Sequence, residues 1–375
     1  MMHILIGGDI APTKSNFEFF NNGNSLALVD KSLLSILNKS DFRIFNLETP
    51  LSDVISPIEK SGPCLIAPTK TINGIKALGA NLLGVANNHI FDQGEQGLFS
   101  TIKVLNENHL SYTGISKNLE EASLPYIFTL AGLRIGVYAC AEHEFSIAGV
   151  TRAGANPFDP LESPDHICTL KAECDYVIVL YHGGREHYRY PSPYLQKVCR
   201  KLIGKGADIV VTQHSHCIGC EEKYMGGVII YGQGNFLFDH SDNEFWQTGL
   251  LIDLEINDRK HAVINYIPLR KNKNSVKLAD PDDARIILAD FVKRSTEIRD
   301  SDFILSEYHK IAMATKKDYL RTCLGKEGET FLFRLTNKLY KGKYLDKLYD
   351  REHTLRILNC LRCEAHREIF MKGLE

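Results

Sequence analysis

The chain has 375 residues, of which 44% are hydrophobic and 24% are charged, and its formal net charge is −2. This composition is ordinary for a globular protein and supplies ample apolar material for a full-sized core. Near-neutral charge gives no overall electrostatic footprint for nucleic acid, so we expect no nucleic-acid partner. The length predicts one large domain with an appendage, or two domains.

No apolar run approaches the ~18 to 20 residues that a membrane-spanning helix needs. The segment Met1–Asp9 lacks the basic start, the long apolar stretch and the small-residue cleavage site of a signal peptide. We therefore expect no transmembrane segment, and a cytoplasmic protein is the simplest interpretation.

Short β-rich apolar runs alternate with polar, Gly-bearing turns and helical stretches up to about residue 270. Nine runs are predicted as strands: Ile4–Ile6, Phe42–Asn46, Leu82–Ala86, Ile135–Tyr138, Tyr176–Tyr181, Ile209–Thr212, Val228–Tyr231, Gly249–Ile256 and Ala262–Pro268. Apolar residues at helical spacing predict helices over Asp92–Asn108 and Tyr194–Lys205. This alternation favours an α/β fold, and the last two runs predict an antiparallel hairpin or meander.

The character of the sequence changes near Asp280. Five later stretches carry helical periodicity with Lys and Arg on the other face: Ala284–Arg294, Ser301–Thr315, Lys316–Leu324, Thr330–Tyr340 and His353–Lys372. We predict a mostly helical C-terminal region over residues 276–375, after an α/β domain over residues 1–275. A charged outer face is normal for packed helices. The alternative is a docking surface for a partner protein, a membrane or an anionic glycan.

Among the ten cysteines, two pairs have CxxC spacing, Cys217/Cys220 and Cys360/Cys363. Without a secretion signal, the cysteines are not expected to form a disulfide framework. We interpret them as reduced, buried thiols. A zinc site is the alternative, and it would need both pairs to combine.

Polar side chains follow five of the predicted strands at the point where each strand ends. These residues are Asp9, Glu48, Asn88 with His89, His182, and the pair His214 and His216. Residues two apart in extended backbone project to the same side, so the two histidines of His-Ser-His can face one cation or two adjacent ones. In α/β sheets, sites form beyond the carboxyl ends of the strands. Carboxylate, amide oxygen and imidazole suit Mn²⁺, Fe, Zn²⁺ or Mg²⁺, so we predict a divalent metal centre.

These segments resemble the capsule-biosynthesis CapA family, known from poly-γ-glutamate synthesis, within the calcineurin-like metallophosphoesterase superfamily. The resemblance covers roughly residues 1–270 and rests on six matching segments: Gly8-Asp9, Asn46–Pro50, Ala86–Asp92, His182–Glu186, His214–His216 and Tyr231–Phe236. It implies a β-sandwich flanked by helices, with a two-metal site at the strand ends. It is specific for the family and not for the substrate.

The resemblance also implies a role for each matching residue. Asp9 and His216 would bind the first metal, and Glu48 would stand where a bridging aspartate usually stands. The second metal would be held by Asn88, His182 and His214. His89 would be the general acid, or the group that steadies developing negative charge, beside a two-metal clamp.

Two departures from the family pattern weaken the first metal site. The superfamily motif DxH is Asp9-Ile10-Ala11 here, so one expected ligand is missing. Glu48 is also one methylene longer than the usual aspartate. One or two ions per chain are therefore both compatible with the sequence.

Three further residues are candidates for substrate binding. Arg185 could grip a phosphate or carboxylate with two parallel hydrogen bonds, although a surface salt bridge is the alternative. Glu186 stands where the family pattern has an acid. Asn235 belongs to a Gly-rich loop that is either a tight turn or a wall of the cleft.

The sequence thus predicts a metal-dependent hydrolase that cleaves a phosphoester, or an amide or other bond, in bacterial capsule or surface-polymer biosynthesis. The expected substrate is a small molecule or a polymer, and a capsule-synthesis protein is an expected partner. The competing interpretation is a non-catalytic assembly or scaffolding factor with a degraded metal site. The pathway rests on the resemblance alone.

Overall fold

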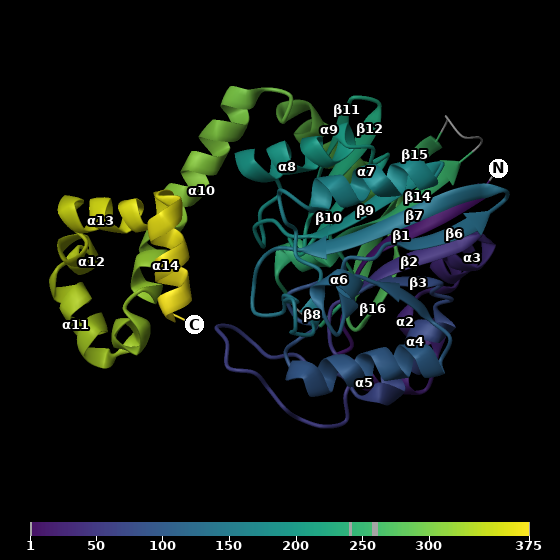
Figure 1. The fold of residues 1–375 in the computed structure, drawn as a ribbon, viewed down its shortest axis with the longest axis horizontal. Coiled ribbons are helices and arrows are strands. Elements are labelled where there is room, and N and C mark those ends of the chain that lie inside the picture. Colours follow the sequence, from purple (N-terminus) through teal and green to yellow (C-terminus); the bar gives the residue numbers. More distant parts are fainter. Residues whose placement is uncertain (1, 240–241, 257–261, 375) are drawn as a thin grey trace. The chain divides into compact units, whose positions relative to one another are not determined.

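The computed structural model describes residues 2–239, 242–256 and 262–374, apart from the side chain of Glu329. The chain divides into two compact units, Met1–Ile304 and Leu305–Glu375 (Figure 1). The division falls within helix α10 (Ser301–Thr322). The two units are described separately below.

The larger unit contains two main sheets. The first has the order β16-β15-β14-β1-β2-β3-β4, and β13 also pairs with β1. Strands β1 to β4 run parallel to one another, whereas β14, β15 and β16 add antiparallel pairs at the other edge. Their bounds are β1 (Met2–Ile10), β2 (Phe42–Leu47), β3 (Leu82–Gly84), β4 (Ser111–Thr113), β13 (Asn235–Leu237), β14 (Thr248–Ile256), β15 (Ala262–Asn272) and β16 (Ser275–Leu278).

The second sheet has the order β11-β12-β10-β9-β7-β6. Its four central strands are parallel, and antiparallel strands form both edges. The bounds are β6 (Tyr126–Leu130), β7 (Leu133–Ala141), β9 (Tyr176–His182), β10 (Ile209–Gln213), β11 (Ile218–Tyr224) and β12 (Gly227–Gln233). A small separate sheet joins β5 (Ile115–Ser116) to β8 (Gly154–Ala155).

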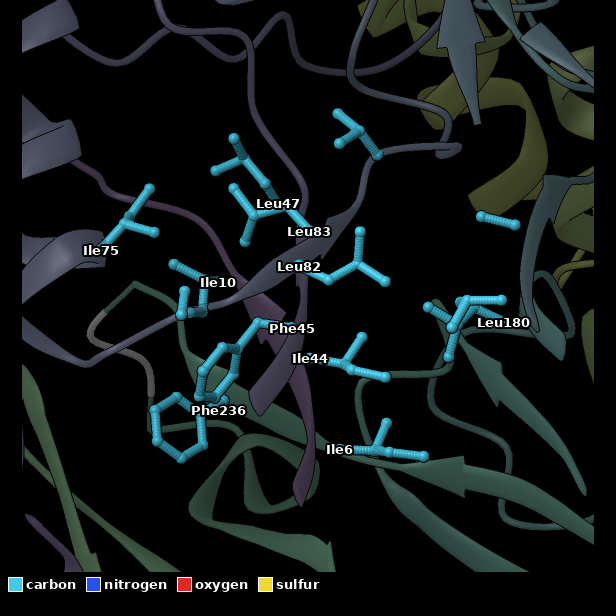
Figure 2. Packing of buried hydrophobic residues seen from close by; sticks show 14 of the residues in the cluster. Ile6, Ile10, Ile44, Phe45, Leu47, Ile75, Leu82, Leu83, Leu180 and Phe236 are labelled. Atoms are coloured by element: carbon cyan, nitrogen blue, oxygen red, sulfur yellow. The ribbon is translucent and has the colours of Figure 1, made fainter. Parts of the chain in front are cut away.

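Alternating side chains of the second sheet serve two different cores. In β9, Ile178 and Leu180 belong to the large apolar cluster that also contains Ile6 and Leu82 of the first sheet. Figure 2 shows Leu180 packed in this cluster with side chains from β1, β2 and β3. Because neighbouring residues of a strand point to opposite faces, the other face of β9 joins a second cluster with helix residues such as Leu202. The result is a β-sandwich flanked by helices.

The helices of this unit connect strands and cover the sheets. In helix α8 the sequence determines where the helix begins. The Ser192 side chain accepts a hydrogen bond from the backbone N–H of Leu195, and Pro193 occupies the first turn. The bounds are α1 (Phe17–Asn21), α2 (Ser25–Leu28), α3 (Lys31–Lys39), α4 (Ile72–Ala77), α5 (Gly94–Glu107), α6 (Leu119–Ala122), α7 (Ser163–Glu173), α8 (Pro193–Gly204) and α9 (Pro281–Glu297), with the 3₁₀ helices η1 (Thr69–Thr71) and η2 (Glu244–Gln247).

The smaller unit is helical. After α10 it contains η3 (Gly325–Glu329), α11 (Phe331–Leu339), α12 (Tyr344–Leu348), α13 (Arg351–Arg362) and α14 (Glu364–Leu374). Phe333 and Tyr340 pack their rings near Tyr344, and Leu345 is buried. Over the described ranges, we find no helix with both the length and the apolar character that crossing a bilayer requires.

The predicted α/β class, with sheets flanked by helices and a helical C-terminal region, is confirmed. All nine predicted strands are present, and β14 and β15 form the expected antiparallel hairpin. Three helical predictions differ in their bounds. The predicted helices Ser301–Thr315 and Lys316–Leu324 form one helix, α10, which ends at Thr322, because no Gly or Pro interrupts them. The predicted helix His353–Lys372 is split at Cys363, whose backbone is extended. The domain division after residue 275 stays a prediction, and α9 beyond it contacts β11 and β15.

Candidate metal centre

The carboxyl ends of parallel strands from both sheets bring the predicted ligands together. Asp9 is the second-to-last residue of β1, Glu48 follows β2, and Asn88 and His89 lie in the loop after β3. His182 is the last residue of β9, and His214 and His216 follow β10. All seven side chains are buried. The sandwich therefore places donors from two sheets at one shared edge, as the strand ends predicted.

The donor atoms fall into two groups that share Glu48. One group consists of Glu48, His182 and His214, and the other of Asp9, Glu48 and His216; within each group the donor atoms lie within 4.8 Å of one another. The amide oxygen of Asn88 lies 3.1 Å from Nε2 of His182 and so extends the first group. We call Glu48, Asn88, His182 and His214 the histidine-rich group, and Asp9, Glu48 and His216 the aspartate group.

Both groups fit a divalent cation, and the clearest sign is Glu48. Within the described parts of the chain, no donor makes a hydrogen bond to either carboxylate oxygen of this fully buried residue, and Nδ1 of His214 is likewise without a partner. A buried carboxylate without hydrogen bonds is costly unless a cation compensates it. Carboxylate, amide and imidazole donors are the set that Mn²⁺, Fe²⁺ or Zn²⁺ accepts.

Burial controls the protonation of these groups in the absence of a cation. Burial, reinforced by the charge of Glu48, raises the pKa of Asp9 to about 7. Burial also raises the pKa of Glu48. Burial lowers the pKa of His182 to about 4, and burial with neighbouring imidazoles lowers that of His214 well below its usual value. For His216, burial disfavours the protonated imidazole. The negative charges of Glu48 and Asp9 favour it more strongly, so the pKa of His216 is raised.

Two buried asparagines contact the candidate ligands and fix their orientation. Nδ2 of Asn46 donates to Oδ1 of Asp9 at 2.8 Å and lies 3.3 Å from Nδ1 of His182, so it touches one ligand from each sheet. Oδ1 of Asn235 lies 2.8 Å from Nδ1 of His216. Because that oxygen accepts, Nδ1 carries the proton, and Nε2 is left for a cation. Such outer contacts fix the orientation of metal-binding side chains.

His89 belongs to a chain of three side chains. Its Nδ1 lies 2.6 Å from Oδ2 of Asp92, and Oδ1 of Asp92 pairs with Nζ of Lys60. The backbone N–H of Leu65 also donates to Asp92. Asp92 is fully buried, so its charge is compensated by these three contacts. The pairing directs Nδ1 of His89 away from the cleft and leaves Nε2 as the atom that can act in it.

A cleft of about 350 Å³ opens over this centre. Its wall includes Asn88, His89, His216 and Glu186, together with Lys60, Ser61, Gly62, Pro63, Leu65, Thr13, Glu144, Phe238, Asp239 and Trp246. Glu186 is part of this wall, and its contact with a substrate stays a prediction. Arg185 is exposed and is not part of this wall. Asn235 is buried behind His216 and is not part of the wall either, so substrate contact by Arg185 and Asn235 stays a prediction.

The departure from the DxH pattern is visible in the aspartate group. Ala11 is fully buried, and its backbone N–H donates to the carbonyl of Leu237. Its methyl group brings no donor to the centre, so the aspartate group has three members and the histidine-rich group has four. His214 and His216 both have left-handed backbone, with φ of 82° and 52°. This conformation is uncommon for residues other than glycine, and it occurs at turns and at functional sites.

No role was predicted for Asn46, Asp92, Lys60 or Trp246. Asn46 and Asp92 lie inside segments that match the family, and this match could have indicated that they lie beside the ligands. Lys60 and Trp246 reach the cleft from a loop and from η2, where no periodic pattern marks them. Trp246 packs 5.2 Å from the ring of His216, and its Nε1 donates to Nε2 of His187.

The cysteines show no sign of a second metal centre. All ten are free of disulfides. Cys217 and Cys220 are buried next to β11, and burial raises the pKa of both thiols. Across the parts of the chain that the structure describes, the two potential metal-binding groups contain no cysteine. The joint zinc site therefore finds no support.

The chain is similar in sequence to known capsule biosynthesis proteins. The chain is 28% identical over 221 residues to the capsule biosynthesis protein CapA of Bacillus anthracis, covering 57% of this chain and 53% of that protein. It is 27% identical over 208 residues to the PGA biosynthesis protein CapA of Bacillus subtilis, covering 54% and 55%. It therefore spans about half the length of these relatives. A probable polyglutamine synthesis accessory protein of Mycobacterium tuberculosis is 24% identical, covering 70% and 72%.

Among solved structures, a phosphatase of Mycoplasma pneumoniae is similar with a TM-score of 0.46 and 16% identity, covering 72% of this chain and 94% of that one. The family described as "Bacterial capsule synthesis protein PGA_cap" matches residues 3–240, which include every member of both donor groups. The chain belongs to this family of bacterial capsule synthesis proteins.

Proposed function

We propose that this protein is a metal-dependent hydrolase that cleaves a phosphoester or an amide bond in capsule or surface-polymer biosynthesis. The observation that carries the proposal is the buried carboxylate of Glu48. Among the residues that the structure describes, no donor makes a hydrogen bond to it, and two groups of donors share it. A purely structural carboxylate in this position would be expected to have donors.

The position of each side chain suggests its role in the reaction. The histidine-rich group would hold one cation, and the aspartate group would hold a second. A divalent cation at such a site lowers the pKa of water and polarises a phosphoryl or carbonyl oxygen. His89 reaches the same cleft with Nε2 while Asp92 holds Nδ1, which suits it to give a proton to a leaving group.

The walls of the cleft support a charged substrate of modest cross-section. Lys60 and His216 bring positive charge, whereas Glu186 and Glu144 bring negative charge. The cleft is open to solvent on one side, so the end or an internal bond of a polymer chain can enter as readily as a small molecule. A relative named as a synthesis accessory protein supports a capsule-synthesis protein as a partner.

The decisive experiment measures metal and turnover together. Purified protein is analysed for bound metal and assayed with bis-p-nitrophenyl phosphate and with γ-glutamyl peptides, with Mn²⁺, Fe²⁺, Zn²⁺ or Mg²⁺ added. We expect His182→Ala combined with His214→Ala to lose both metal and turnover. The exposed residue His366 provides a matched control, as His366→Ala should change neither. Metal content that is unaffected by the double substitution would remove the proposal.

A second candidate function is non-catalytic assembly of the synthesis machinery. Ala11, in the position of an expected histidine, favours it because it leaves the aspartate group with three members. The two candidates differ in what His89→Ala does. If the wild type turns over substrate and His89→Ala stops it while metal is retained, the assembly role alone is rejected. Metal binding without any turnover, together with tight binding of a synthase, would favour assembly.

A further inference from the structure

Helix α11 of the smaller unit has an exposed apolar stripe that does not pack against the other helices of this unit. Phe331, Leu335 and Leu339 recur every four residues and therefore lie on one side of the helix, with Leu332 beside them. Their exposed fractions are 79%, 44%, 74% and 71%, respectively. Phe333 lies on the opposite side and packs near Tyr344. Thus α11 is already anchored by its inner face, and the stripe is a second apolar face.

Positive charge accompanies the stripe. Arg334 and Lys338 lie on the flank of the helix, and Lys341 and Lys343 follow its end; all four side chains are exposed. The excess is a property of this unit. Residues 305–375 contain 15 Lys and Arg but 10 Asp and Glu, whereas residues 1–304 contain 29 and 36.

Apolar and cationic side chains together specify one kind of occupant. A helix with large apolar residues on one face and Lys or Arg beside them lies in the plane of a membrane, with its apolar face among the acyl chains. Lys and Arg near an anionic bilayer add attraction at each residue. We propose that α11 docks the protein reversibly onto an anionic phospholipid surface, with Phe331, Leu332, Leu335 and Leu339 inserted and the basic residues at the headgroups.

This inference is independent of the proposed hydrolase activity. It concerns where the protein works and uses no residue of the metal centre. A protein that binds vesicles without hydrolysing anything would support it, and an active enzyme that ignores vesicles would refute it.

The test is co-sedimentation of the full-length protein with vesicles. Phosphatidylcholine vesicles with about 30% phosphatidylglycerol are compared with pure phosphatidylcholine, at low and high salt. We expect binding to the anionic vesicles only, weakened by salt. Phe331→Ser with Leu332→Ser should lower the partition coefficient about tenfold or more, and Lys338→Glu with Lys341→Glu should do likewise. Because these side chains are exposed, the substitutions leave the packed interior unchanged.

Matched controls come from the larger unit. Val150 is 86% exposed and Lys39 lies exposed at the end of α3, so Val150→Ser and Lys39→Glu should not change vesicle binding. Equal binding to neutral and anionic vesicles, or no binding at all, would overturn the proposal. So would a wild-type dimer that Phe331→Ser with Leu332→Ser converts to a monomer without vesicles, since the stripe would then be an interface between two copies.

Discussion

The two donor groups of the metal centre share Glu48 but differ in size and in charge. The histidine-rich group has four members, and burial keeps the imidazoles of His182 and His214 neutral at ordinary pH. The aspartate group has three, and the pKa values of Asp9 and His216 are both raised. A neutral imidazole is ready to bind a cation, whereas a protonated carboxylate must first lose its proton. Apart from the shared Glu48, the histidine-rich group is therefore ready to bind metal, whereas metal binding by the aspartate group depends on pH.

The largest effect should come from removing one imidazole from each half in turn. His214 and His216 are two residues apart, both buried and both left-handed, so they form a matched pair. We expect His214→Ala to remove the tightly bound metal and reduce turnover to background. His216→Ala should keep that metal and retain measurable turnover. Metal analysis and steady-state assays check this, and equal losses in both variants would break the comparison.

Substitution of His89 should have the next largest effect, without changing either half. Loss of a positioned proton donor typically costs about 10²- to 10⁴-fold in rate. We expect His89→Ala to lower turnover within that range while metal content stays at the wild-type level. Substrates with good leaving groups should suffer least, because they need little protonation. A fall in metal content in His89→Ala would show that His89 is a ligand instead.

Much of the fold could be predicted because strands and helices carry periodic signals. The nine predicted apolar runs are strands, and the parallel order of β1 to β4 follows from the helices between them. Short elements such as β5, β8 and β13 were not predicted, because two or three residues give no period. The helix end at Cys363 was also not predicted, since it is set by local backbone geometry.

The candidate ligands could be predicted because each stands at a strand end, and the structure brings all of them together. What the sequence could not give was contact between distant segments. Lys60 meets Asp92 across a loop, and Trp246 meets His187 and His216 from another. Nor could the sequence show that Asn235 stands behind His216 and not at the cleft wall, since a Gly-rich loop fits either place. Side-chain direction in loops depends on tertiary packing.

Asn235 offers a way to weaken the aspartate group alone. Its oxygen holds the Nδ1 proton of His216, and loss of such an outer partner typically costs about 10- to 100-fold in metal affinity or activity. We expect Asn235→Ala to weaken the metal of the aspartate group by that amount and to leave the metal of the histidine-rich group unchanged. Metal titration by calorimetry measures both. Asn235→Asp serves as the conservative control, because a carboxylate oxygen accepts the same hydrogen bond.

The smallest effect expected is a difference in pH dependence between the halves. The folded protein without metal holds a proton on Asp9 below a pKa of about 7. Protons therefore compete with the cation of the aspartate group as the pH falls. From about pH 8 to about pH 6, a single competing proton lowers the apparent affinity about tenfold. The imidazoles of the histidine-rich group carry no proton over this range, so they add no such dependence. Asp9→Asn should reduce the steeper dependence, and His216, whose pKa is also raised, accounts for what remains. A slope equal for both metals would show that the shared Glu48 dominates instead.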